Sequence, residues 1–165
     1  MTETMDTATR RAGRLPHEIA MVNLLIFNLG LCGGILASTM LRHGSAMENY
    51  RLAFVLAPLS GSLALMGYSF WRWRTFKNTA APWLLAHWQI ACRHYRFLLI
   101  AYGVCASLIG LGWLLSLTNP NLKDVMFVAL VRVAVAPLLI AIMVIAVLES
   151  SALFQANKGE APGRI

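Results

Sequence analysis

The sequence predicts an all-α integral membrane protein with four transmembrane helices. Of its 165 residues, 58% are hydrophobic and 13% are charged, against about 45–50% and about 25% in soluble domains. Its mean hydropathy is +0.63. Fourteen Lys and Arg with seven Asp and Glu are too few to coat a soluble domain of this size. The composition therefore excludes a soluble domain and a disordered chain.

The first apolar run covers residues 19–40, and no charge interrupts it. About 20 helical residues cross a bilayer core, so this run is the first predicted span. It is too long for a signal peptide, whose apolar region has about 7–15 residues, and we expect it to be retained. Residues 1–18 are polar and are predicted to form a disordered or interfacial cytoplasmic tail.

Small residues line one side of this first span. Gly30 and Gly34 form a GxxxG pair, and Gly33 with Ala37 repeats the spacing. Such stripes let helix backbones approach closely in lipid, although glycine is also common in membrane helices generally. We interpret the stripe as a packing seam, either within the protein or with a partner.

The second span is predicted over residues 52–71, where Pro58 removes one backbone hydrogen bond and favours a kink. An amphipathic helix follows over 83–96, with Trp88 and Tyr95 on one side and Arg93 and Arg96 on another. We expect this helix to lie at the headgroups and to lead into the third span.

The third and fourth spans are predicted over 97–117 and 125–154. The fourth, with roughly 30 residues, would be about 45 Å long and must tilt, bend at Pro137 or protrude from a core of about 30 Å. Residues 155–165 are polar and form a second predicted cytoplasmic tail, which leaves one membrane domain over 19–154.

The basic residues predict the orientation of these spans. Ten lie on the side shared by the two tails and the loop between the second and third spans: Arg10, Arg11, Arg14, Arg72, Arg74, Lys77, Arg93, Arg96, Lys158 and Arg164. Three lie on the other side: Arg42, Arg51 and Lys123. This bias predicts that both termini are cytoplasmic, where basic segments attract anionic lipid headgroups. No nucleic-acid-binding motif accompanies the basic residues.

Arg132 and Glu149 are the charged residues inside the apolar runs of the four spans. Intramembrane ionisable residues are candidates for function. Seventeen residues separate them, roughly 25 Å along a helix, so they cannot pair along a straight helix. Each either extends to its own interface or has a function. A buried Glu149 could bind a proton or a cation.

His87 and His94 are the candidate cofactor-binding residues, seven positions apart on one side of the amphipathic helix. This spacing is too long for one metal ion. The segment resembles, in spacing alone, a His-x6-His segment with Arg before the second His in the haem-binding membrane anchors of succinate dehydrogenase. That resemblance would imply haem or quinone binding. Here His87 precedes the span, and the family's serine–histidine–arginine motif is absent, so the sequence is not assigned to the family.

The sequence carries no GxSxG, HExxH, CxxC or Walker motif, which argues against an enzyme. It favours a non-catalytic accessory subunit of a larger complex, in contact with other integral membrane subunits in the bacterial inner membrane. Two alternatives stay open. One is a redox-linked subunit that binds haem or quinone through His87 and His94. The other is a small homo-oligomeric proton-coupled transporter that uses Glu149.

Overall fold

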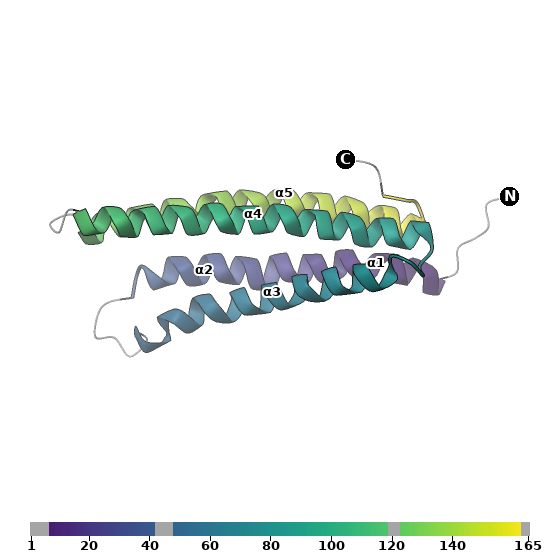
Figure 1. Cartoon of the computed structure of the whole chain (residues 1–165), viewed down its shortest axis with the longest axis horizontal. Helices are drawn as coiled ribbons and strands as arrows, with labels where there is room; N and C mark the ends of the chain where they lie inside the picture. Colours follow the sequence, from purple (N-terminus) through teal and green to yellow (C-terminus); the bar gives the residue numbers. More distant parts are fainter. Residues whose placement is uncertain (1–6, 42–47, 119–122, 163–165) are drawn as a thin grey trace.

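A computed structural model of the chain describes residues 7–41, 48–118 and 123–162, and the regular elements in them are all helical. Four helical segments lie side by side as an up-and-down bundle (Figure 1). The start of α1 and the end of α5 lie at the same end of this bundle, which we call the terminal end (Figure 1). Each segment is long and apolar enough to cross a membrane. The predicted all-α class, with four helices long and apolar enough to cross a membrane, is therefore confirmed in the described residues.

The first segment starts earlier than the sequence predicted. It consists of α1 (Thr7–Val22), a π-helical turn (Asn23–Asn28) and α2 (Leu29–Ser38). Residues 7–18, which the sequence assigned to a disordered or interfacial tail, thus belong to the helix. The reason is a line of buried positions, Gly13, His17 and Ala20, which recur every three or four residues and face the bundle.

The π-helical turn has a side-chain explanation. The amide nitrogen of Asn28 donates a hydrogen bond of 2.9 Å to the backbone carbonyl oxygen of Asn23, five residues earlier. This bond spans the same five-residue interval that distinguishes a π-helical turn from an α-helical one. The turn places both asparagine side chains in the buried interior of the bundle.

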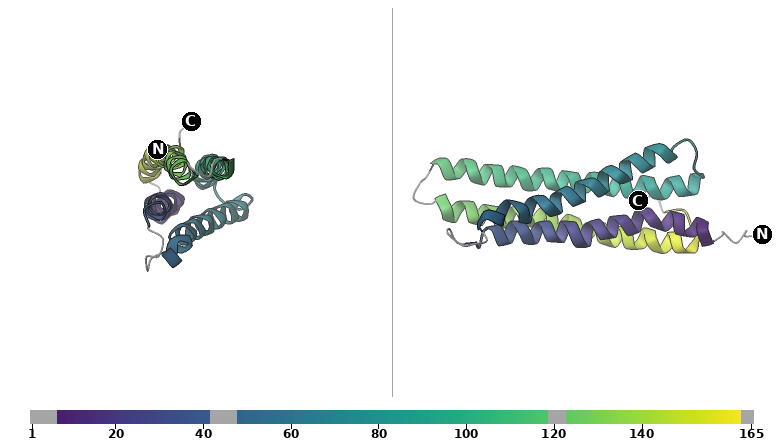
Figure 2. Two further views of the ribbon diagram at one scale, coloured as in Figure 1. Left: turned by 90° about the vertical axis from the view of Figure 1, so that its left-hand side faces the viewer. Right: turned by 90° about the horizontal axis from the view of Figure 1, so that it is seen from below.

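Helix α3 (Arg51–Phe76) follows a short 3-10 turn, Glu48–Tyr50, and extends past the predicted end at residue 71. The guanidinium of Arg72 lies 4.2 Å above the ring of Phe76 in this extra turn. Helix α3 slants across the other three segments (Figure 2). In its most apolar 18-residue stretch, 17% is buried inside the protein, against 39% in the first segment. Helix α3 is therefore the least enclosed of the four segments.

Helix α4 (Pro82–Thr118) combines the predicted amphipathic helix and third span in one helix of 37 residues. Pro82 is its first residue, a position that needs no backbone N–H donor. Trp88, Ala91 and Tyr95 are buried. Arg93 and Arg96 are exposed, as the periodicity predicted. Residues 83–96 are therefore continuous with the third span and pack in the bundle.

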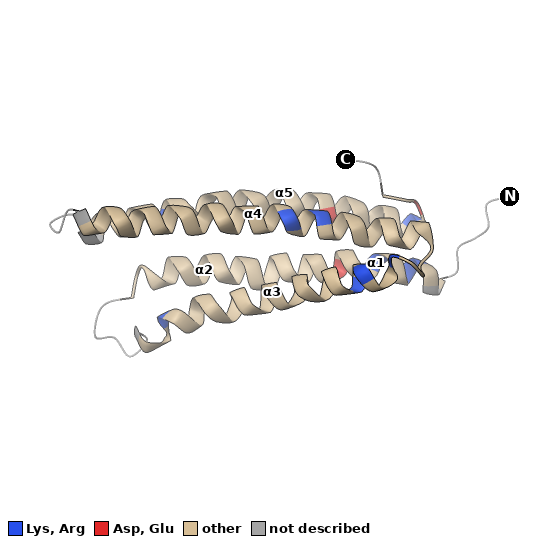
Figure 3. Cartoon of the chain, in the orientation of Figure 1, with Lys and Arg blue, Asp and Glu red and all other residues tan. Residues whose placement is uncertain are grey.

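Helix α5 (Lys123–Lys158) has 36 residues and extends past both predicted ends of the fourth span. Gly159 terminates it with a φ of 75°, the left-handed conformation that glycine adopts without steric cost. Arg42, Arg164 and the termini at 1–6 and 163–165 lie outside the described residues. In the described part, Lys and Arg gather toward the terminal end (Figure 3).

The predicted glycine stripe divides between two faces. A Cβ on Gly34 would collide with the backbone oxygen of Phe54, and one on Gly30 would lie 3.7 Å from the Cβ of Pro58. These two glycines therefore face α3. A Cβ on Gly33 would have no neighbour within 4 Å, and Ala37 is exposed.

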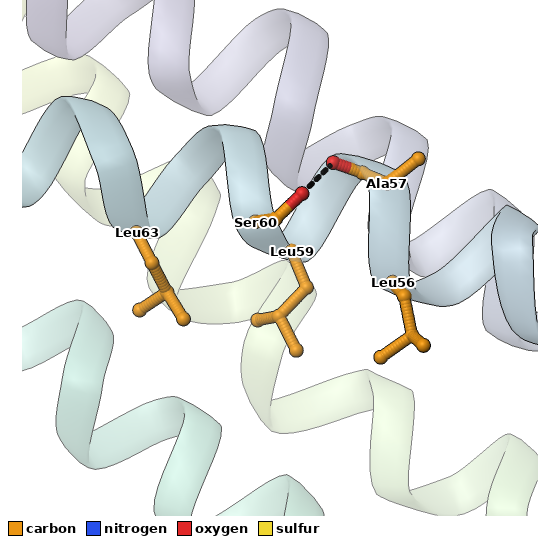
Figure 4. A pocket seen from close by; sticks show the side chains of 5 residues that line it. All are labelled: Leu56, Ala57, Leu59, Ser60 and Leu63. Carbon is orange, nitrogen blue, oxygen red and sulfur yellow. Dashed lines mark hydrogen bonds between the residues drawn. The ribbon is translucent and has the colours of Figure 1, made fainter.

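An open apolar groove of about 470 Å³ lies along α3. Its lining is formed by Leu56, Ala57, Leu59, Ser60 and Leu63. The three leucine side chains point to the same side of the helix, and the hydroxyl of Ser60 donates to the carbonyl of Ala57 at 2.9 Å (Figure 4). Because that hydroxyl bonds to its own helix, the groove offers little polar recognition.

Candidate functional site: a buried histidine–glutamate chain

Three histidines and one glutamate meet inside the terminal half of the bundle. His17 comes from α1, His87 and His94 come from α4, and Glu149 comes from α5. His17, His87 and Glu149 are 0% exposed, and His94 is 5% exposed. We call these four side chains the His–Glu chain. Burial of so many ionisable groups is costly unless they are paired, and here each one is.

Glu149 is the branch point of the His–Glu chain. Its Oε2 lies 2.5 Å from Nδ1 of His17, and its Oε1 lies 2.7 Å from Nδ1 of His94. The other nitrogen of His17, Nε2, lies 2.9 Å from Nδ1 of His87. Nε2 of His87 then lies 3.2 Å from the carbonyl oxygen of Glu160. Hydrogen bonds therefore run without a break from His94 to the backbone just beyond α5.

The carbonyl oxygen of Glu160, at the end of the His–Glu chain, determines the direction of these hydrogen bonds. A carbonyl oxygen only accepts, so Nε2 of His87 carries a proton. In a neutral His87, Nδ1 then accepts, and Nε2 of His17 donates to it. Nδ1 of His17 and Oε2 of Glu149 share one further proton across a contact of 2.5 Å, and charge assistance shortens such bonds. This arrangement is either an imidazolium–carboxylate pair or a neutral imidazole with a carboxylic acid.

A second arrangement contains the same number of protons. If His87 is the imidazolium, its Nδ1 donates to Nε2 of His17, and Nδ1 of His17 donates to a carboxylate on Glu149. All the hydrogen bonds of the His–Glu chain are kept in both arrangements, and Nδ1 of His94 donates to Oε1 in each. A proton can therefore move between Glu149 and His87 by exchange along existing bonds. The site is chemically suited to proton transfer.

Trp83 and Gly13 close the outer end of the chain. The Trp83 ring lies edge-on to His87, with 4.8 Å between ring centroids. A Cβ on Gly13 would overlap the same indole ring, so only glycine leaves room for it at this position. Arg14, the residue after Gly13, forms an ion pair with Glu18 at 2.6 Å that is partly exposed. The chain thus ends close to the protein surface.

A second polar network occupies the interior beyond Glu149. The amide of Asn28 donates to Ser62 at 3.2 Å, and the hydroxyl of Tyr102 donates to the Asn28 side-chain oxygen at 2.6 Å. Asn28 therefore links α3 and α4 to the first segment, as expected for an asparagine that cross-links membrane helices.

Between the two networks lie Asn23 and Tyr95, both at least 99% buried. The amide nitrogen of Asn23 and the hydroxyl of Tyr95 have no hydrogen-bond partner in the part of the chain that the structure describes. Buried polar groups normally have one. Polar side chains thus extend from the terminal end toward the middle of the bundle.

The structure brings some of the predicted residues together and separates others. Glu149 is buried and contacts His94, whereas Arg132 is exposed on α5. His87 and His94 do not contact each other but connect through His17 and Glu149. The sequence placed His87 in a cytoplasmic loop, and the extension of α4 buries it instead. Both ring nitrogens of His87 lie within hydrogen-bond distance of other groups.

His17 is the residue that sequence reasoning missed as a member of this site. Its signal was present, because Gly13, His17, Ala20 and Leu24 recur at helical spacing into the first apolar run. Within the described ranges, no three His, Cys, Asp or Glu side chains are arranged to hold a metal ion. The chain matches no family model, and comparisons with curated proteins and with solved structures found none similar to it.

Proposed function

We propose that this chain is a small proton-coupled membrane transporter in which Glu149 is the proton-binding residue. The observation that supports it is the buried His–Glu chain, which links Glu149 through His17 and His87 to the backbone of Glu160 by hydrogen bonds of 2.5–3.2 Å. Ionisable residues inside membrane bundles are characteristic of proton relays. The predicted cytoplasmic side would then supply protons to His87.

The depth of Glu149 supports this role. Helix α5 has 36 residues, about 54 Å, so if centred it would extend about 12 Å beyond each face of a hydrocarbon core of about 30 Å. Glu149 lies nine residues before the end of α5, about 14 Å, and therefore near the boundary of the core. From there, the polar side chains of Asn23, Tyr95 and Asn28 lead further inward.

Proton flux into vesicles tests the proposal. We expect Glu149→Gln to reduce the flux to that of protein-free vesicles, because the amide keeps the shape of the side chain but cannot carry the proton. The measurement uses purified protein in vesicles that contain a pH-sensitive dye, with a potassium diffusion potential imposed across the membrane.

Glu18→Gln is the matched control, since Glu18 is a partly exposed glutamate one residue from His17. We expect it to conduct like the unmodified protein. Equal flux in the Glu149→Gln and unmodified proteins would refute the proposal. The accessory-subunit interpretation stays a prediction, which co-purification of partner subunits in mild detergent would support.

A further inference from the structure

A basic groove opens at the terminal end, beside α1 and separate from the His–Glu chain. Its volume is about 500 Å³. Its lining is formed by Thr7, Arg10, Arg11, Arg14, Glu18 and Asn157. Three guanidiniums and one carboxylate give this lining a formal charge of +2. The groove thus joins the outer turns of α1 to the end of α5.

The arginines of the groove have different roles. Arg14 is held by Glu18 through its Nε at 3.0 Å and its Nη2 at 2.6 Å. This pair neutralises the carboxylate that would otherwise repel an anion. The Nε of Arg10 is buried and has no hydrogen-bond partner within the described part of the chain. With Arg14 paired to Glu18, the net charge of +2 in the lining rests on Arg10 and Arg11, and Arg10 is half-buried.

The height of the groove indicates which anion would reach it. Arg14 lies five residues before Ile19, the first residue of the charge-free apolar run, which is about 7.5 Å along the helix. Headgroups occupy about 5–8 Å on each side of the hydrocarbon core. Arg14 is therefore level with the lipid phosphates, and Arg10 and Arg11 lie about one turn further out, on their aqueous side.

We infer that this groove binds an anionic lipid headgroup, whose phosphate lies level with Arg14 and is met from the aqueous side by Arg10 and Arg11. Arginine presents a planar fork of N–H groups that matches phosphate oxygens. The open side of the groove leaves room for the rest of the headgroup, and the neighbouring apolar helices would contact the acyl chains. This inference does not depend on the proposed proton transport.

Native mass spectrometry of the purified full chain tests the inference, with phosphatidylglycerol as the probe and phosphatidylcholine as the neutral lipid. We expect the double variant Arg10→Gln/Arg11→Gln to bind phosphatidylglycerol about 30-fold more weakly, from about tenfold per 1.4 kcal/mol and about 1 kcal/mol per basic residue. Binding of phosphatidylcholine should not change.

The control is Arg74→Gln/Lys77→Gln, which removes two exposed basic charges from the same end of the bundle. It should bind phosphatidylglycerol within a few-fold of the unmodified protein. An equal loss in both double variants would overturn the inference, because net charge alone would then explain lipid binding. The inference would also be overturned if inorganic phosphate bound to the unmodified protein with the same affinity as phosphatidylglycerol. The groove would then be a site for a soluble anion.

Discussion

At the scale of single residues, Glu149 has the most consequential environment in the molecule. Both of its oxygens contact imidazole nitrogens from other helices, at 2.5 and 2.7 Å. In a water-excluded interior such bonds are strong, and the loss of one partner leaves a buried group unsatisfied. The same four side chains should therefore contribute to stability as well as to the proposed proton transfer, and the two roles can be separated by measurement.

We expect His17→Leu to destabilise the protein by about 3–5 kcal/mol, because it leaves Glu149 and His87 without their shared partner. The free energy of unfolding in detergent micelles measures this. In the double variant His17→Leu/Glu149→Leu, part of the loss should be recovered, since the unpaired buried charge is removed as well. A double variant as unstable as the sum of its single variants would show that the two residues are not coupled.

A second residue-scale prediction concerns Tyr102. We expect Tyr102→Phe to cost about 1 kcal/mol of unfolding free energy, at roughly 0.6 kcal/mol for each interhelical bond lost, since the hydroxyl bonds both Asn28 and Ser62. Proton flux should remain, because Tyr102 is not a member of the His–Glu chain. Loss of flux at unchanged stability would instead place Tyr102 on the route of the proton.

At the scale of elements, the sequence predicted the approximate positions of the long helices and the buried face of residues 83–96. Runs of apolar residues identified the four spans, and the 3.6-residue period identified the buried face of residues 83–96. Periodicity reports which face is buried, but not what buries it. The amphipathic face that suggested contact with headgroups is covered by protein, since Trp88, Ala91 and Tyr95 are buried.

The glycine stripe gives a test at this scale. We expect Gly34→Ala to destabilise the bundle by about 1–3 kcal/mol, because its Cβ would meet the backbone of α3, which cannot move as a side chain can. Gly33→Ala is the matched control, since open space surrounds that position. It should be neutral or slightly stabilising, as expected for alanine in a helix. Similar unfolding free energies for the two variants would contradict this account of the seam.

At the scale of the whole molecule, the His–Glu chain depends on topology. His17 and Glu149 are 132 positions apart and meet because the up-and-down arrangement returns α5 to the end where α1 begins (Figure 1). A single sequence shows which side chains are polar but not which helices are neighbours. The sequence therefore identified Glu149, His87 and His94 as candidate site residues. It did not show that His17 is a partner of Glu149.

The orientation of the bundle is a prediction at this same scale. We expect green fluorescent protein fused after the last residue to fluoresce in bacterial cells, because the basic terminal end should face the cytoplasm. Alkaline phosphatase at the same position should be inactive, since it folds outside the cytoplasm. The opposite pair of results would place the groove and the outer end of the His–Glu chain on the other side of the membrane.

The edge contact between Trp83 and His87 has a practical consequence. An indole ring responds electronically to a positive charge placed beside it, and the Trp83 and His87 ring centroids are 4.8 Å apart. When the proton resides on His87, the emission of Trp83 should differ from its emission when the proton resides at Glu149. With the other four tryptophans replaced by phenylalanine, the protein would contain an intrinsic fluorophore that reports the location of the proton without any added label.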